Sequence, residues 1–271
     1  MRHADVIRWA SAATAAILLA ACGSPSAKPA NVDVTMADYS ISAPAAIPAG
    51  MVTFTAHNTG AQLHQAALVR LDSGKTAADF TAALMQKGGP PPPWIVWMGG
   101  LQNNSVTTLG LEPGSYVWYC LIPDSTGVPH VARGMLAPMT VTPASGPVAP
   151  APAADIDVTM HDYQWDFSKP ITAGHHVFKV STLPGQPHEW VVIRLKQGAT
   201  LNDVLAWAAK PSGFPAAAEW IGGIPILQAG QVNYATIDFT PGHYAFVCFV
   251  PDATDGQPHA AHGMVKDLVI Q

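Results

Sequence analysis

The chain contains two copies of one pattern. Val32–Met36 (VDVTM) returns as Ile156–Met160 (IDVTM), and an Asp-Tyr pair follows each of them. Five further features recur in the same order: His64 and His188, Gly99-Gly100 and Gly222-Gly223, Pro113-Gly114 and Pro241-Gly242, Cys120 and Cys248, Met135 and Met264. Each copy spans about 115 residues, which is the length of a domain and not of a solenoid repeat unit. We therefore expect the chain to fold the same way twice.

The two copies are separated by a segment that lacks strand or helix signals. Residues 144–154 (ASGPVAPAPAA) are rich in Pro and Ala and contain no charged or aromatic residue. This composition is typical of a semi-rigid, extended linker. We therefore place the first domain at residues 31–143 and the second at residues 155–271.

Strand signals dominate both copies, as runs of apolar and β-branched residues bounded by turn residues. The predicted strands are 51–57, 65–71, 105–109, 115–120 and 137–141 in the first copy, and 176–181, 189–195, 231–239, 243–248 and 266–270 in the second. Pro-Gly pairs between them are typical of tight turns that connect antiparallel strands.

One helix is predicted inside each copy. The runs Thr76-Ala77-Ala78-Asp79 and Thr200-Leu201-Asn202-Asp203 have the Ser/Thr-x-x-acid pattern of a capped helix start. We expect these helices to extend to about Lys87 and Lys210 and to end at Gly88 and Pro211. Seven or so strands and one inserted helix per copy predict an all-β fold of two tandem Greek-key β-sandwich domains.

The first residues have the pattern of an export signal. Arg2 and Arg8 flank a short positive segment, and the apolar run Trp9–Ala21 that follows is too short for a bilayer, which needs about 20 residues. The run ends in LAAC, which resembles a bacterial lipobox and implies removal of residues 1–21 and lipidation of Cys22. An ordinary signal peptide, with Cys22 incidental, is the alternative. Residues 22–30 then form a flexible tether, and the protein is expected to be lipid-anchored to the cell membrane or outer membrane, facing the periplasm or the exterior.

The chemically reactive side chains gather in two short loops. Tyr116–Met135 and Tyr244–Met264 each contain a cysteine, a histidine and a methionine in that order, and each copy has another histidine far upstream. The candidate ligands are His64, Cys120, His130 and Met135 in the first copy, and His188, Cys248, His259 and Met264 in the second. Two imidazoles, one thiolate and a weak thioether are the donors of mononuclear redox copper. The pattern therefore predicts one copper ion per domain.

Each copy resembles a cupredoxin, the blue copper fold of plastocyanin and azurin. The resemblance is carried by Asn58-Thr59-Gly60 before His64, by Pro187-His188-Glu189, and by two series: Tyr116, Cys120, Pro123, His130 and Met135, then Tyr244, Cys248, Pro251, His259 and Met264. It covers nearly all of both copies. It implies type 1 copper, electron transfer to a redox protein partner, and docking through an apolar patch around the loop histidine.

The spacing of cysteine and histidine departs from that family. Compact cupredoxins place the loop histidine a few residues after the cysteine, whereas nine residues separate Cys120 from His130 and ten separate Cys248 from His259. Both inserts start with Pro-Asp and end with Gly-x-Pro, which favours a structured Ω-like excursion. If the excursion folds away from the ligands the site closes; if it pulls the histidine out of reach, only the fold remains.

Other cysteine and histidine roles stay open at this stage. A disulfide between Cys120 and Cys248 is the default suspicion for an exported protein, although the two residues occupy equivalent places in separate domains. His262 is expected at the rim of the second loop; a role as a proton-coupled partner or as an alternative ligand is left open. The remaining histidines, His57, His161, His175, His176 and His243, are single or surface-like and receive no chemical role.

Several functions fit these observations. The net charge of −5, the 11% charged residues and the absence of a Lys/Arg cluster argue against nucleic-acid binding. An electron carrier is favoured over an enzyme, because multicopper oxidases need His-x-His pairs and this chain has none. A nitrite-reductase-like enzyme would need a further copper on three histidines, for which His161, His243 and His262 are the candidates. Copper delivery or scavenging also fits the sequence, as does a metal-free binding module; the oligomeric state is open.

Overall fold

The computed structural model describes residues 1, 27–86, 91–210 and 214–271. The predicted signal segment beyond Met1, the lipidation site Cys22, and the predicted helix ends at Lys87, Gly88 and Pro211 lie outside the described residues. Within the described ranges, no helix has the length and apolar character needed to cross a bilayer.

Within its described residues, the first copy is built from nine strands, one α-helix and one 3₁₀ turn. In chain order they are β1 (Ala30–Ala37), β2 (Ser40–Ser42), β3 (Ala46–Pro48), β4 (Gly50–Asn58), β5 (Ala66–Leu71), α1 (Ala77–Met85), β6 (Ile95–Leu101), β7 (Val106–Leu111), β8 (Gly114–Tyr119), η1 (His130–Arg133) and β9 (Leu136–Thr142).

The part of the second copy that the structure describes repeats this order with eight strands. They are β10 (Ile156–His161), β11 (Gln164–Phe167), β12 (Gly174–Thr182), β13 (His188–Leu195), α2 (Leu201–Ala209), β14 (Ala218–Leu227), β15 (Val232–Phe239), β16 (Gly242–Val247), η2 (His259–His262) and β17 (Val265–Ile270). The predicted strands are confirmed within one or two residues at most ends.

Each copy is a sandwich of two sheets. In the first copy one layer has the strand order β2-β1-β4-β7 and the other β3-β9-β8-β5-β6; in the second copy the layers are β11-β10-β12-β15 and β17-β16-β13-β14. The pairs β1–β4 and β10–β12 are parallel, whereas most other neighbours are antiparallel. Neighbouring strands are therefore often distant in sequence, and the prediction of two all-β Greek-key sandwiches is confirmed.

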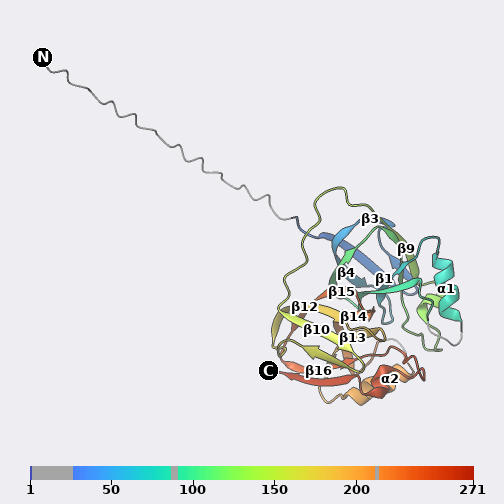
Figure 1. Cartoon of the computed structure of the whole chain (residues 1–271). Coiled ribbons are helices and arrows are strands. Elements are labelled where there is room, and N and C mark those ends of the chain that lie inside the picture. The colour runs from blue at the N-terminus through green and yellow to red at the C-terminus, as the bar shows by residue number, and fades with distance from the viewer. Residues whose placement is uncertain (2–26, 87–90, 211–213) are drawn as a thin grey trace.

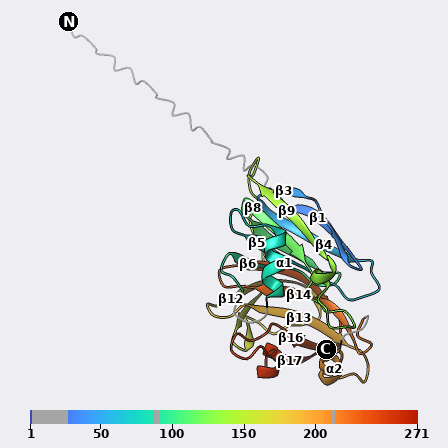
Figure 2. The same ribbon diagram turned by 90° about the vertical axis from the view of Figure 1, so that its right-hand side faces the viewer.

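The two sandwiches share their sheets. Strand β7 pairs antiparallel with its counterpart β15, with Val106–Leu109 opposite Asn233–Thr236, and β6 meets β14 where Met98 faces Leu227. The layers thereby become continuous sheets of eight and nine strands that run through both copies, as Figures 1 and 2 show. Joining these strands covers sheet edges that would otherwise expose unpaired backbone groups.

Asn233 ties the two copies together at this junction. Its side-chain carbonyl accepts from the backbone N–H of Gly100 at 3.0 Å, and its amide donates to the carbonyl of Met98 at 2.9 Å. The residue is only 1% exposed, so both of its amide groups find their partners across the junction and not in water. A buried amide satisfied in this way fixes the register of one copy against the other.

Both predicted helix starts are confirmed. Thr76 accepts from the N–H of Asp79, whose carboxylate accepts from the N–H of Thr76; Thr200 and Asp203 form the same reciprocal pair. The predicted ends at Lys87 and Lys210 compare with last helical residues Met85 and Ala209, with Lys210 as the C-cap of α2. The two helices lie on the same side of the molecule (Figure 1).

Tyr116 and Tyr244 fasten the turns before the strands that lead to the cysteines. The Tyr116 hydroxyl donates to the carbonyl of Glu112 at 2.9 Å, and the Tyr244 hydroxyl donates to that of Thr240 at 2.7 Å. Each bond closes the Pro-Gly turn onto the strand that follows it, a tyrosine corner of the kind found in β-sandwiches. The two turns thereby fix the starts of β8 and β16, and with them the positions of Cys120 and Cys248, which directly follow these strands.

Candidate metal centres

Three distant segments meet at one end of each sandwich. His64 lies in the turn between β4 and β5, Cys120 directly follows β8, and His130 begins η1. Since β5 and β8 are hydrogen-bonded neighbours, with Ala67 opposite Tyr119, the sheet places the upstream histidine beside the cysteine. The second copy uses β13, the end of β16 and η2 in the same way.

The first-copy side chains converge tightly. The Nδ1 atoms of His64 and His130 are 3.0 Å apart, and the Cys120 Sγ is 3.5 Å from the Nδ1 of His130. All three side chains are fully buried, and their potential ligand atoms lie within 4.8 Å of one another. They therefore form a closed, three-donor centre with two nitrogens and one sulfur.

The second copy reproduces this centre. The Nδ1 atoms of His188 and His259 are 3.0 Å apart, and the Cys248 Sγ is 3.4 Å from the Nδ1 of His259. Their ligand atoms also lie within 4.8 Å of one another, and all three residues are buried. The two centres thus match in donor type, arrangement and burial.

The long excursion between cysteine and histidine folds away from the centre. Its neck is closed where Pro123 bridges Pro129 and where the N–H of His130 donates to the carbonyl of Ile122 at 3.0 Å. The second copy has the same two contacts: Pro251 bridges Pro258, and the N–H of His259 donates to the carbonyl of Val250. The insert is therefore pinched off as a separate loop, and the histidine returns to the cysteine as in the first of the two expected outcomes.

A buried aspartate holds each excursion in shape. Asp124 accepts from Thr126, from the N–H of Val128 and from Arg133, and these bonds keep its pKa well below the usual range, with hydrogen bonding to Thr126 the largest cause. Asp252 plays this part in the second copy, where Tyr163 and Gln186 replace the arginine as donors. The Pro-Asp at the start of each insert thus marks the residue that organises the loop.

The methionines return next to the cysteines along the backbone. A left-handed Gly134 ends η1, the N–H of Met135 donates to the carbonyl of His130, and the N–H of Cys120 donates to the carbonyl of Met135. Gly263, Met264 and Cys248 show the same contacts in the second copy. Both methionine side chains are fully buried in the same apolar clusters as the cysteines.

An aspartate behind each upstream histidine sets the direction of its ring. His64 Nε2 lies 2.6 Å from Asp38 Oδ1, and His188 Nε2 lies 2.8 Å from Asp162 Oδ1. An Nε2–H donated to a carboxylate leaves the lone pair of Nδ1 pointing into the centre. The close packing leaves no room for a side chain at Gly60, where a Cβ would stand 2.7 Å from His64 Nε2.

The Asp-Tyr pairs, which the sequence indicates only as part of the repeat, lie beside the candidate ligands. Besides the aspartates, Tyr39 packs edge-on against the His130 ring at 4.9 Å and Tyr163 against the His259 ring at 5.2 Å. The sequence does mark these pairs, because both follow the repeated strand at the same distance. Their contact with the candidate ligands is visible only in the three-dimensional structure.

The thiols are buried and unpaired with each other. Both cysteines are free, so the suspected disulfide is not formed. The backbone N–H groups of Gln65 and Glu189 point at the two sulfurs, at 3.5 and 3.4 Å. Burial raises the pKa of the Cys120 thiol to about 12, and burial together with the charge of Glu189 raises that of Cys248 further. Without a cation, both sulfurs remain protonated.

Burial also lowers the pKa of the ligand imidazoles. Loss of water and the neighbouring histidine bring the pKa of His130 and of His188 from 6.5 to about 4, and burial lowers the pKa of His64 and His259 in the same direction. The four rings are therefore neutral at neutral pH, which is the form that binds a metal.

Acid is expected to destabilise the metal-free protein between pH 6.5 and pH 4. In the unfolded chain these histidines bind protons from about pH 6.5, whereas in the folded protein His130 and His188 do so only near pH 4. The free energy of unfolding therefore decreases as the pH is lowered, by at most about 1.4 kcal/mol per pH unit for each imidazole. Glu189, whose pKa burial raises to about 7, acts in the opposite direction and offsets one ring. Urea unfolding of chelator-treated protein at a series of pH values measures the slope.

The matched variant for this titration is His130→Gln, which removes one of the imidazoles whose pKa burial lowers. Its slope should be shallower than that of the unaltered chain. A free energy of unfolding that stays constant from pH 6.5 to pH 4.5 would contradict the expectation.

The remaining histidines lie outside the two centres. His57, His161, His175, His176 and His243 each lie 2.8–3.2 Å from their own aspartate, at Asp33, Asp166, Asp238, Asp155 and Asp267. His262 stacks on Tyr163 at 5.0 Å and approaches Asp255 at 3.3 Å, at the exposed rim of the second loop. Within the described part of the chain, His161, His243 and His262 do not gather into one cluster.

No protein-family model and no curated protein sequence matches the chain. Among solved structures, auracyanin B is similar, with 20% identity over 47% of this chain and 95% of that one, at a TM-score of 0.30. The dithionite-reduced auracyanin of Roseiflexus castenholzii is similar at 21% identity, covering 43% of this chain and 100% of that one, at a TM-score of 0.28. A multicopper oxidase is similar at 12% identity over 89% of this chain and 88% of that one, at a TM-score of 0.24.

The deciding observation is internal to the chain. Each sandwich carries, at one end, an upstream histidine beside a Cys…His…Met loop, with the histidines and the cysteine brought within bonding reach of one centre. Both copies have a cupredoxin-like fold. The expected Greek-key β-sandwich is thereby confirmed, and the predicted histidines and cysteine of each copy lie together at one end of it.

The donor set of each cupredoxin-like centre fits copper. Two neutral imidazole nitrogens with lone pairs directed at one point, and one buried sulfur, are the soft and intermediate donors that copper selects. In each centre the Nδ1 atoms of the two histidines are 3.0 Å apart. Without a metal ion there is room for only one proton between them. A cation that replaces this proton and the thiol proton would satisfy all three donors together.

Proposed function

We propose that the protein is an electron carrier with one type 1 copper ion in each copy. The observation that supports this most directly is the pair of buried His-Cys-His centres, built twice with the same distances. His64, Cys120 and His130 would hold the ion in the first copy, and His188, Cys248 and His259 in the second, with Met135 and Met264 as weak fourth donors.

The surroundings of the centres suit rapid electron transfer more than metal storage. Copper supplies a one-electron couple, and the two oxidation states prefer different geometries, so a carrier benefits from ligands that cannot rearrange. Here the upstream histidine is held by a sheet and by Asp38 or Asp162, and the loop histidine by the closed neck of the excursion. The protein's part is thus to keep the donors in place and to exclude water.

We further propose that the carrier is exported and lipid-anchored through Cys22, with a tether to the membrane surface. The support is the sequence pattern of the leader and lipobox. A redox protein partner is expected to dock near the loop histidines, whose rings lie close to the ends of the sandwiches.

Copper loading of residues 23–271, which leave out the predicted leader and Cys22, tests the proposal. We expect about two copper ions per chain and an intense blue absorption that disappears on reduction. Zinc, which also binds cysteine and histidine, serves as the competing ion. A colourless protein that binds no copper, or one that prefers zinc at both centres, would refute the electron-carrier function.

A further inference from the structure

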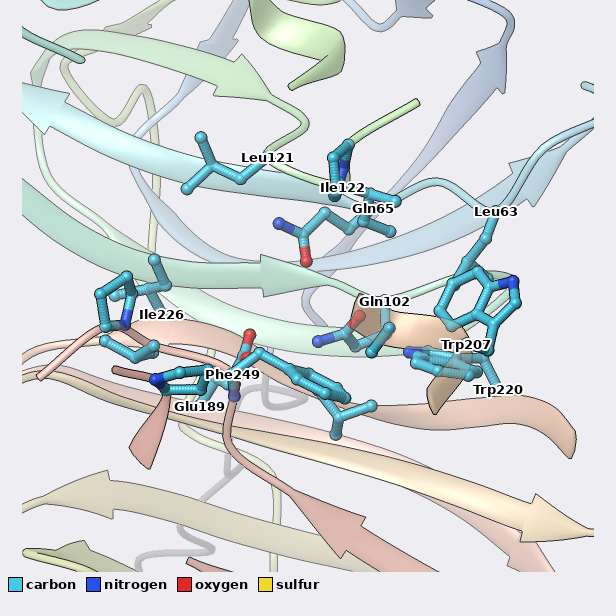
Figure 3. A pocket seen from close by; sticks show the side chains of 16 residues that line it. Leu63, Gln65, Gln102, Leu121, Ile122, Glu189, Trp207, Trp220, Ile226 and Phe249 are labelled. Atoms are coloured by element: carbon cyan, nitrogen blue, oxygen red, sulfur yellow. Dashed lines mark hydrogen bonds between the residues drawn. The ribbon is translucent and has the colours of Figure 1, made fainter. Parts of the chain in front are cut away.

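A pocket lies between the two copies, and its lining includes residues next to the candidate ligands in the chain. It has a volume of about 390 Å³ and is partly open to the surface. Leu63, Gln65 and Gln102 line it from the first copy, and Glu189, Trp207 and Trp220 line it from the second (Figure 3). A cavity of this size is in the range that holds small organic ligands.

The second copy contributes an aromatic wall. Trp220 stacks on Phe249 with their rings 15° from parallel at 6.5 Å, and Trp207 meets Trp220 edge-on at 5.4 Å. Leu121 and Ile122, which directly follow Cys120, face this wall from the first copy. The flat ring surfaces and the aliphatic side opposite favour a planar aromatic body over a branched or charged one.

Gln102 is a buried polar residue in the lining of the pocket. Its side chain is 1% exposed, and both its amide nitrogen and its carbonyl oxygen lack a hydrogen-bond partner. Leaving such groups unpaired in a protein interior costs about 1–3 kcal/mol each. The unmet donor and acceptor lie side by side in the lining of the pocket, so a single ligand group can satisfy both.

The repeat pairs Gln102 with Gln228, since each directly follows the last residue of its strand and its backbone carbonyl accepts from the N–H three residues later. The side-chain carbonyl of Gln228 accepts from the N–H of Trp97 across the junction at 3.0 Å, whereas the side chain of Gln102 has no such partner. Neither the metal centres nor the junction of the sheets uses its amide. The pocket is therefore asymmetric: the unpaired amide belongs to the first copy and the aromatic wall to the second.

Two other polar side chains lie close to it. Figure 3 shows the polar ends of Gln65 and Glu189 directed into the space between the copies, from opposite sides. One Glu189 oxygen accepts from the N–H of Phe249 at 2.7 Å. The polar part of the pocket is thus small and central, surrounded by apolar walls.

We propose that this pocket binds a small aromatic alcohol of the phenol class. A hydroxyl group both donates and accepts, which matches the free carbonyl and the free amide of Gln102, and the ring stacks on the aromatic wall. The site consists of residues that ligate no metal, so it is expected in metal-free and in metal-loaded protein alike. Its failure and the failure of copper binding are therefore separate results.

Calorimetric titration of residues 23–271, without added copper, tests this site. 4-Propylphenol is the probe, and propylbenzene, which lacks only the hydroxyl, is the matched ligand. We expect saturable binding of one propylphenol per chain and at least about tenfold weaker binding of propylbenzene, because the latter leaves Gln102 unpaired. Equal affinity for the two compounds, or no saturable binding of either, would overturn the proposal.

Variants separate the polar recognition from the cavity. Gln102→Leu should weaken propylphenol about tenfold and leave propylbenzene unchanged or tighter. The exposed Gln197→Leu is the matched control and should change neither. Ala208→Trp, at the pocket lining on α2, should block both compounds and serves also if Gln102→Leu does not fold. Propylphenol binding that survives Ala208→Trp would place it elsewhere and refute the site.

Discussion

Bound copper is expected to fall from about two ions per chain to about one in either Cys120→Ser or Cys248→Ser, and to none in the double variant. The blue absorption should fall in the same steps, since it arises from the thiolate–copper bond. The physical reason is that each sulfur is the single anionic donor in its centre, and a buried serine hydroxyl does not ionise to replace it. Metal analysis and visible spectra of the three proteins, loaded under identical conditions, measure both quantities.

The matched control is Ala245→Ser, which places a hydroxyl at a fully buried position on β16, the strand that leads to Cys248. This variant should keep both ions, so that a loss in Cys248→Ser is traced to the ligand and not to a polar group in the core. Retention of two copper ions in either single cysteine variant would show that the cysteine does not bind. Loss of both ions in a single variant would show that the centres depend on each other.

Gly223→Ala is expected to destabilise the protein by more than about 4 kcal/mol, a large part of the total stability of a domain. Gly223 lies on β14 with a φ of +101°, and an added Cβ would stand 1.7 Å from the carbonyl oxygen of Trp190. That oxygen belongs to the backbone of β13, so no side-chain rotation relieves the clash. The pairing of Val191 with Gly223 must break, which disturbs the strand that begins with the ligand His188.

Gly198→Ala supplies the control for Gly223→Ala. Gly198 also has a positive φ, of +78°, but a Cβ there would meet nothing within 4 Å. This variant should lose only about 1 kcal/mol, the backbone cost alone. Urea unfolding followed by tryptophan fluorescence compares the two. A Gly223→Ala protein whose unfolding free energy is within about 1 kcal/mol of the control would contradict the tight approach of β13 and β14.

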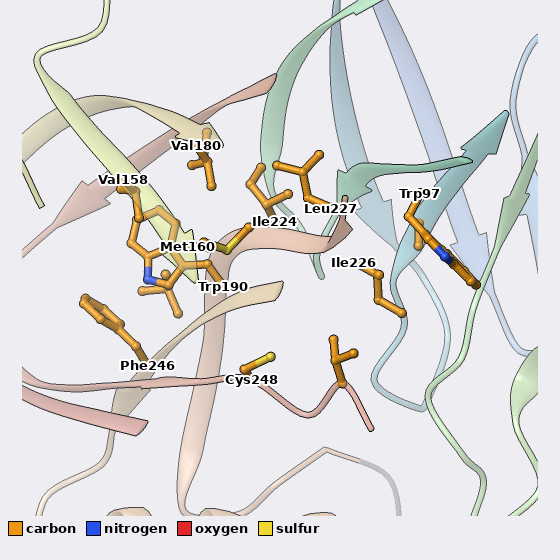
Figure 4. Packing of buried hydrophobic residues seen from close by; sticks show 14 of the residues in the cluster. Trp97, Val158, Met160, Val180, Trp190, Ile224, Ile226, Leu227, Phe246 and Cys248 are labelled. Atoms are coloured by element: carbon orange, nitrogen blue, oxygen red, sulfur yellow. The ribbon is translucent and has the colours of Figure 1, made fainter. Parts of the chain in front are cut away.

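The core explains why a backbone clash at this point reaches the metal centre. Figure 4 shows Trp190, Ile224 and Cys248 in one apolar cluster, which also takes in Trp97 from the first copy. Trp190 and Cys248 are both fully buried. Because such interiors are close-packed, a shift of β13 moves residues around the sulfur. Stability and copper affinity are therefore expected to change together in this variant.

The repeat and the hydrophobic patterns predicted most of the fold. The helix starts at Thr76 and Thr200 were predictable because a capping box is a local signal, complete within four residues. Strands β6 and β14 were among those not predicted, and each contains a Gly-Gly pair. In the structure these glycines allow neighbouring strands to approach closely, a reason that depends on residues distant in the chain.

For the candidate ligands, too, the sequence predicted one part and the tertiary structure decided the other. Residue types and their order were enough to name the eight candidate donors, because the chemistry of copper restricts the choice to histidine, cysteine and methionine. Whether a nine- or ten-residue insert lets His130 and His259 reach the cysteines depended on the closure of the loop neck by Pro123–Pro129 and Pro251–Pro258, contacts that no local pattern encodes.

The sequence by itself determined a duplicated β-sandwich and the donor types of its two centres, since periodicity and side-chain chemistry are properties of the chain. Only the tertiary structure decided that Asp38 and Asp162 orient the upstream histidines, that the copies share continuous sheets, and that a pocket with an unpaired Gln102 lies between them. These features arise where separate segments meet. Their geometry is set by packing between residues far apart in sequence, which a linear pattern does not record.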